Sequence, residues 1–247
     1  MDVNGHTVAD GAATALREMI LSGELRPAAR VHQDQLADRL GLSRTPLRTA
    51  LATLANDGLL VYEANRGYRV REFSVESIGS VFEIRSVLEA QACRIAGRLS
   101  CSEEMLDRLD TLVRTGDDIL ASGRLDPKDL PAWRRMNVEF HEAIIQAAMN
   151  PWLEEFVART HNVPMVSDRV ILWDDYEIIK RSHDDHHRIA KCLRQGDGER
   201  AAAIMHEHVS FAGDLLTERL SKDPEAAFEQ FIGSPHSANS NPKEDET

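Results

Sequence analysis

The sequence of 247 residues has few aromatic side chains, few cysteines and no long apolar run. Aromatic residues make up only 5% of it, which argues against a protein that binds single-stranded nucleic acid by base stacking. Its three cysteines, Cys93, Cys101 and Cys192, are a sparse and odd-numbered set and no disulfide framework, so we expect a reducing cytoplasm. No apolar run approaches the ~20 residues of a membrane helix, and no secretory signal is visible, so we expect no membrane association.

The formal net charge of −12 is spread unevenly along the chain. Residues 1–72 contain nine arginines, no lysine and nine acidic residues, so this front segment is neutral. Residues 73–220 contain 18 basic and 26 acidic residues, and residues 221–247 contain two basic and six acidic residues. Because the acidity belongs to the body and the tail, it does not exclude nucleic-acid binding by the front segment. The tail is rich in Ser, Asn, Pro and acids, and we predict that it is disordered.

The front segment predicts three helices followed by a β-hairpin. The third helix follows the turn Gly41-Leu42-Ser43, in which Ser43 occupies the N-cap position, and Pro46 falls in its first turn. Apolar residues recur in this helix every three to four positions, which predicts one buried stripe. The order of elements is that of a winged helix-turn-helix, with helices predicted at Thr7–Ser22, Gln33–Leu40 and Arg44–Asn56 and strands at Leu59–Glu63 and Tyr68–Arg71.

Six residues of this segment are candidates for contact with double-stranded DNA. Four lie off the apolar stripe near the start of the third helix, which is the end that a recognition helix places in the major groove. Two lie at the tip of the hairpin, where a glycine allows close approach. Arginine binds guanine edges or phosphates, although single exposed arginines are also common as solvated surface residues. The candidates are Arg44, Thr45, Arg48, Thr49, Arg66 and Gly67.

The front segment resembles the DNA-binding domain of GntR-type bacterial transcription regulators. The resemblance rests on Ser43-Arg44-Thr45-Pro46-Leu47-Arg48, on Gly58-Leu59 and on Arg66-Gly67-Tyr68. It implies a homodimer that reads two half-sites of operator DNA. Two positions depart from the pattern. Ala28-Ala29 stands where a glycine usually follows the proline, and Thr49 replaces a commoner acidic residue, which could alter the site preference.

The body of the chain shows helical periodicity and no alternating strand pattern between Ser74 and Leu220. Pro164 is expected to kink or split its helix. Six or seven antiparallel helices with short connections form a bundle. The predicted segments are Val75–Leu99, Ser102–Ala121, Lys128–Ala148, Trp152–Leu172, Asp175–Arg194 and Glu199–Leu220.

Histidines on the inward faces of three predicted helices indicate a metal site. His141 borders one apolar stripe, and His208 lies inside another. In the helix between them, the phase of the apolar residues selects His186 over His183 and His187. Three imidazoles suit Zn²⁺, Ni²⁺ or a similar divalent ion and leave coordination positions open. The alternative is that each is a hydrogen-bonded core histidine.

This part of the chain resembles the FCD domain, the C-terminal ligand domain of FadR-like regulators. The matching pieces include Asn137-x-x-Phe140-His141, Asn150-Pro151, His186-x-x-Ile189 and Met205-x-x-His208. The resemblance implies that Asn137, His141, His186 and His208 hold a divalent metal ion and that a small organic acid binds beside it. Asn137 is neutral and therefore a weaker ligand than a carboxylate, so the metal affinity could be lower, or the bound acid could supply the charge.

Arg85 is the candidate for binding the carboxylate of that acid, because a guanidinium pairs with a carboxylate through two hydrogen bonds. Arg85 and Glu89 also belong to the resemblance, and they are four residues apart. The alternative role of Arg85 is therefore an ion pair with Glu89 along the same helix.

These observations predict a mostly α-helical protein with a winged helix-turn-helix DNA-binding domain at 7–72, a helical ligand-binding and dimerisation domain at 73–220 and a disordered acidic tail at 221–247. We expect a ligand-responsive transcriptional repressor and not an enzyme. One alternative is a DNA-binding regulator whose helical domain only dimerises around a structural metal. A metal-dependent hydrolase is more remote, because no HExxH spacing supplies a general base.

Overall fold

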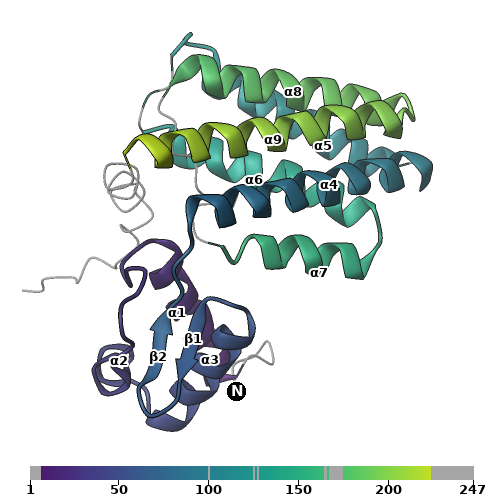
Figure 1. Ribbon diagram of the computed structural model, residues 1–247. Coiled ribbons are helices and arrows are strands. Elements are labelled where there is room, and N and C mark those ends of the chain that lie inside the picture. Colours follow the sequence, from purple (N-terminus) through teal and green to yellow (C-terminus); the bar gives the residue numbers. More distant parts are fainter. Residues whose placement is uncertain are drawn as a thin grey trace, which may run out of the picture. The chain divides into compact units, whose positions relative to one another are not determined.

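The computed structural model describes residues 7–99, 101–124, 126, 128–163, 166 and 175–223 (Figure 1). The chain forms two compact units, one built mainly from the residues up to Ser74 and one built from Val75 onward. The described residues form nine α-helices and one two-stranded sheet, which confirms the mostly helical fold class. In these ranges no helix combines the length and the apolar character needed to cross a membrane.

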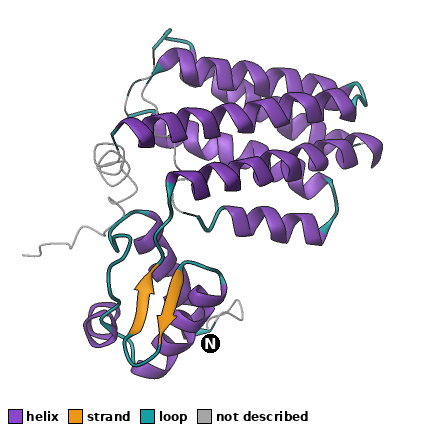
Figure 2. Ribbon diagram, viewed as in Figure 1, coloured by secondary structure: helices purple, strands orange, loops and turns teal. Residues whose placement is uncertain are grey.

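The first unit is a winged helix-turn-helix, as predicted (Figure 2). Leu47, Ala50, Leu51 and Leu54 form the predicted stripe and are all fully buried. They pack with residues of the first two helices and of both strands in one hydrophobic core. The elements are α1 (Val8–Leu21), α2 (Gln33–Leu40), α3 (Arg44–Asn56), β1 (Leu60–Glu63) and β2 (Gly67–Val70), and the two strands pair antiparallel.

Local side-chain chemistry fixes most of the helix ends in this unit. Thr7 accepts a hydrogen bond from the Asp10 amide and completes a capping box at the start of α1. Gly41 ends α2 with a φ of 63°, a conformation that costs glycine little. Ser43 occupies the N-cap position of α3, but its side chain makes no capping hydrogen bond. The predicted N-cap position of Ser43 is therefore confirmed.

A segment before α2 lies beside the hairpin, a feature that the sequence pattern did not indicate. The Val31 amide donates to the Tyr68 carbonyl at 2.9 Å, and the Val70 amide donates to the Ala29 carbonyl at 2.9 Å. Ala28 takes a φ of 63° in this segment. A side chain in the left-handed region costs about 1–2 kcal/mol, which glycine avoids. The alanine that departs from the family pattern therefore stands at a position that favours glycine.

The described residues of the second unit form six helices, in agreement with the predicted bundle of six or seven. Four of them differ from their predicted ends by no more than two residues, and α4 agrees at both ends. Helix α4 lies side by side with α9, and α8 packs against both α5 and α9 (Figure 1). The helices are α4 (Val75–Leu99), α5 (Glu103–Leu120), α6 (Leu130–Ala147), α7 (Pro151–Thr160), α8 (Tyr176–Arg194) and α9 (Gly198–Lys222).

The helix predicted at Trp152–Leu172 is wrong in its length. Helix α7 ends at Thr160, and residues 161–163 form turns and a bend. Pro164 gives the physical reason, because a proline disfavours helical backbone at the residue before it. Pro164 itself and residues 167–174 lie outside the described residues. The predicted disordered tail also lies outside them from residue 224 onward, and α9 extends two residues into it.

Candidate metal centre and nucleic-acid interface

The start of α3 presents a polar surface opposite its buried stripe. Arg44, Thr45, Arg48 and Thr49 are all exposed. Arg44 forms an ion pair with Asp34 at 3.0 Å, and both side chains are about three-quarters exposed, at 78% and 74%. An exposed pair of this kind contributes at most about 1 kcal/mol, so a phosphate could replace the carboxylate at little cost.

The hairpin tip presents Arg66 to solvent. Its amide donates to the Glu63 carbonyl at 3.0 Å and closes the turn between the strands. Asn65 and Gly67 on either side take φ values of 61° and 83°. Asparagine and glycine adopt this region most readily, so the residue types at the tip match the turn that carries Arg66.

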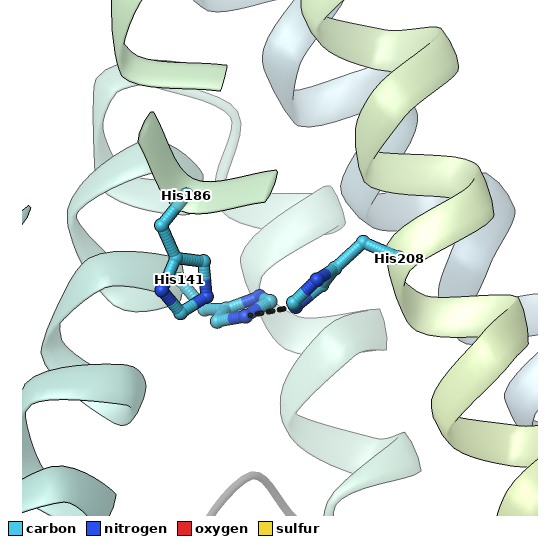
Figure 3. A group of neighbouring side chains, drawn as sticks. All are labelled: His141, His186 and His208. Carbon is cyan, nitrogen blue, oxygen red and sulfur yellow. Dashed lines mark hydrogen bonds between the residues drawn. The ribbon is translucent and has the colours of Figure 1, made fainter. Parts of the chain in front are cut away.

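Three buried imidazoles converge in the helical unit (Figure 3). His141 comes from α6, His186 from α8 and His208 from α9, and their exposed fractions are 1%, 0% and 7%. The Nε2 atoms of His141 and His208 lie 3.3 Å apart. The ring centroids are separated by 5.6 Å between His141 and His186 and by 5.0 Å between His186 and His208. One nitrogen of each ring can therefore reach a common point.

Two buried carboxylates lie beside the outer nitrogens of this cluster. Glu89 contacts His141 Nδ1 through one oxygen, and its other oxygen accepts from Arg85 Nε at 2.5 Å. Asp185 Oδ2 lies 3.7 Å from His208 Nδ1. A carboxylate that accepts from one imidazole nitrogen leaves the other nitrogen as a lone-pair donor for a metal. His141 is oriented in this way and its Nε2 faces His208 Nε2, whereas Asp185 is a charged neighbour of His208 beyond hydrogen-bond distance.

The electrostatics of the cluster favour neutral rings at His141 and His186 and a charged carboxylate at Glu89. Burial lowers the pKa of His141, despite the opposing effect of Glu89. Burial, with the neighbouring His208 and His141, lowers the pKa of His186 well below its ordinary value. Burial alone would raise the pKa of Glu89, but Arg85 and His141 hold it well below its usual range. Metal ligands must be deprotonated, so these shifts suit metal binding.

His186 provides the test of whether a metal ion fits these residues. Both of its ring nitrogens are buried, and neither has a hydrogen-bond partner among the described residues. A buried polar group without a partner is costly, and a divalent ion bound to one nitrogen would remove part of that cost. The residues present therefore fit a divalent metal ion with three nitrogen ligands.

Comparison with known proteins identifies both halves of the chain. The family model described as bacterial regulatory proteins, gntR family, matches residues 8–70. The model of the FCD domain matches residues 80–211, which is a little more than half of the chain. The chain belongs to the GntR family of bacterial transcriptional regulators. It is a GntR-family regulator with an FCD domain, and the resemblance seen in the sequence is confirmed.

Curated relatives of this GntR-family regulator are themselves named as regulators. The Nta operon transcriptional regulator of Aminobacter aminovorans is 28% identical over 202 residues, which cover 81% of this chain and 90% of that protein. The gluconate operon transcriptional repressor of Bacillus licheniformis is 24% identical over 79% of each chain. Among solved structures, McbR/YncC of E. coli shares the fold with a TM-score of 0.66 and 19% identity, covering 92% of this chain and 99% of that one.

Asn137 and Arg85, the other two predicted site residues of the helical unit, are also buried. Asn137 is buried on α6, one turn before His141 on the same face. Arg85 is buried and forms the ion pair with Glu89 that was the alternative to its role as a ligand clamp. Its Nη1 also donates to the Val166 carbonyl at 2.8 Å. The guanidinium of this regulator is thus already held by groups of the protein.

Sequence reasoning missed the carboxylates around the histidines. Glu89 was considered only as a partner of Arg85, and Asp185 was not considered, although it directly precedes His186. It also missed a second group, in which His183 and His187 of α8 both contact Asp117 of α5. The i, i+4 spacing of His183 and His187 was the available signal, because it places both rings on one face of the helix.

Proposed function

We propose that this regulator is a repressor that binds operator DNA as a homodimer and releases it in response to a small organic acid. The buried three-imidazole cluster carries this proposal, because His186 lies fully buried without a hydrogen-bond partner in the described part of the chain. Such a cluster is costly in a domain that only dimerises, and it suits a bound ion with open positions. A ligand regulates only if it favours one arrangement of the DNA-binding units over another.

The proposed metal set is Asn137, His141, His186 and His208, with Zn²⁺ or Ni²⁺ as the ion. A bound divalent ion would supply a Lewis-acidic centre that attracts a carboxylate. In the proposed set three imidazole nitrogens and one amide oxygen would bind the ion, and none of these ligands carries a negative charge. An anionic ligand would therefore balance the charge of the ion, which favours an acid as effector.

The proposed site for the acid lies next to the buried face of α6. Arg134 is buried there, three residues before Asn137, and burial lowers the pKa of its guanidinium. A buried cation gains more from an anionic ligand than an exposed one does. Arg85 forms an ion pair with Glu89, which also contacts His141, so we propose that Arg85 positions His141 through that carboxylate. The relative named as gluconate operon repressor supports an organic acid as the class of effector.

The proposed homodimer is supported by apolar side chains on the outside of α7. Trp152 and Phe156 pack against each other with ring centroids 6.4 Å apart. They nevertheless remain 67% and 48% exposed in the single chain. Large aromatic side chains in a pair are typical of surfaces that a partner covers.

Arg48→Ala is expected to weaken operator binding by about tenfold or more. A well-placed arginine contributes about 1–3 kcal/mol at a base edge, and Arg48 is exposed beside the recognition end of α3. Retardation of the protein's own promoter fragment at low salt, titrated with each variant, measures the change. Arg114→Ala is the matched control, since it removes the same charge from an exposed position in the helical unit. Equal affinities of the two variants would contradict the proposed interface.

Removal of metal is expected to lower the melting temperature of the helical unit and to abolish its response to acids. Calorimetry with and without a chelator measures the first effect, with gluconate as the first acid tested. An acid at 100 times its Kd should add about 2.7 kcal/mol of stability to the metal-loaded protein. If chelation unfolds the unit and no small acid shifts its melting temperature, the metal is structural and the helical unit only dimerises.

A further inference from the structure

We propose that Asp117, His183 and His187 form a second divalent-metal site at the surface of the helical unit, distinct from the buried three-histidine cluster. His183 Nε2 lies 3.0 Å from Asp117 Oδ1, and His187 Nε2 lies 2.7 Å from the same oxygen. The three donor atoms all lie within 4.8 Å of one another. Two imidazole nitrogens and one carboxylate oxygen thus face a common point between α5 and α8.

The separations between these donors are close to those of a bound ion. Ligands about 2.0–2.2 Å from a tetrahedral zinc ion lie about 3.3–3.6 Å from one another. The two observed contacts, 3.0 and 2.7 Å, are shorter than this by about 0.3–0.9 Å. Small side-chain rotations would therefore admit an ion, with no change in the backbone of either helix. Two nitrogens and one oxygen suit Zn²⁺, Ni²⁺, Co²⁺ or Cu²⁺.

Packing holds the inner ligand in place before any ion arrives. His183 is 3% exposed, and its ring lies against the backbone of α5 at Gly116. A Cβ atom at Gly116 would lie 2.2 Å from His183 Cε1, so only glycine leaves room for this ring. The rings of Trp133 and His183 also pack in a T-shaped arrangement, with centroids 5.2 Å apart. The buried Nδ1 has no hydrogen-bond partner within the described ranges, so the ring's polar contact is made through Nε2.

The outer side of the site is open to water. The side chains of His187 and Asp117 are 45% and 49% exposed, so water can fill the remaining coordination positions. Burial alone would raise the pKa of Asp117, but its hydrogen bonds with His187 and His183 lower it. Burial lowers the pKa of His183, which favours the neutral ring. The site therefore offers one negative charge and at least one unprotonated imidazole at neutral pH.

An ion at this site would act on the helix that carries the buried cluster. His183 and His187 flank His186 on α8, and the rings of His183 and His186 meet edge to face with centroids 5.8 Å apart. An ion shared between α5 and α8 would restrain the position of α8. The two sites nevertheless use different ligands, so each can be emptied without removing a ligand of the other.

Counting bound zinc on the full-length protein tests the proposal. Dialysis against Zn²⁺ followed by elemental analysis should give two ions per chain in the wild type and one in His187→Ala. His208→Ala should also retain one, and the double variant should retain none. His206→Ala is the control, because His206 is an exposed histidine of α9 outside both groups, and it should retain two ions. His187 is itself exposed, so its replacement leaves the core intact.

The same counts contain the results that would overturn the second site. A wild type that binds one ion, which His208→Ala removes, has only the buried site. A second ion that persists in His187→Ala is bound elsewhere. If His208→Ala retains two ions while His187→Ala loses one, the surface site is supported. The metal ion proposed for the buried cluster is then contradicted. Asp117→Asn tests the carboxylate ligand separately. It should lower the affinity for the ion at the surface site and leave the affinity for the ion at the buried cluster unchanged.

Discussion

Glu89→Gln is expected to destabilise the helical unit by about 3–5 kcal/mol, because it removes one partner of a buried ion pair and leaves the other charged. Arg85 and Glu89 are 3% and 1% exposed, so water cannot replace the lost charge. The substitution also withdraws the carboxylate from His141 Nδ1. Loss of such an outer partner typically weakens metal binding by about 10–100-fold. Thermal unfolding and a competitive metal titration measure the two effects.

Two further variants separate these effects. Glu155→Gln removes a glutamate from an exposed i, i+4 pair with Arg159 and should change stability by less than about 1 kcal/mol. Arg85→Met combined with Glu89→Gln removes both charges and should recover part of the lost stability, since replacing a whole buried pair is often neutral. It should not recover the metal affinity, because His141 still lacks its carboxylate. If Glu89→Gln, alone or combined with Arg85→Met, bound metal as tightly as the wild type, Glu89 would not position His141 for the metal.

For α8 the sequence was sufficient to predict one of the sides that face inward, but not the other. On α8 the phase of the apolar residues selected His186, and the structure buries this residue fully. The same phase argument set His183 aside, although His183 is also buried. Helix α8 packs against both α5 and α9, so more than one of its faces is covered. A single apolar stripe accounts for the buried surface of a helix that packs against one neighbour. It underestimates the buried surface of a helix that packs against two.

Contacts between distant segments could not be predicted in this way. Glu89 and His141 are 52 residues apart, and Asp117 and His183 are 66 apart. Periodicity gives the direction of a side chain from its own helix, but not which side chain of another helix it meets. Local rules also failed where tertiary contacts hold the backbone. Ala28 takes a positive φ in a segment whose backbone hydrogen-bonds to the wing, although alanine does not favour that conformation.

Helices α4 and α9 meet backbone to backbone at Gly97 and Gly198. A Cβ atom added at Gly97 would lie 2.5 Å from the Cα atom and 2.7 Å from the amide nitrogen of Gly198. Both are backbone atoms, so no side-chain rotation can relieve the overlap. Gly97→Ala must push the start of α9 away from α4, and these two helices form the most extensive helix–helix contact of the unit. Overpacking of this kind costs typically about 1–3 kcal/mol, and we expect the upper end or more.

Gly79→Ala is the matched control for this prediction because Gly79 lies on the same helix. Its added Cβ would lie 3.4 Å from Thr217 Cγ2, an ordinary contact with a movable side chain. Alanine favours helical backbone over glycine by about 1 kcal/mol, so Gly79→Ala should leave the melting temperature unchanged or raise it. If Gly97→Ala behaved as Gly79→Ala does, α4 and α9 would not meet backbone to backbone. Opposite shifts from the same substitution, 18 residues apart on one helix, would instead identify that contact as the origin of the loss.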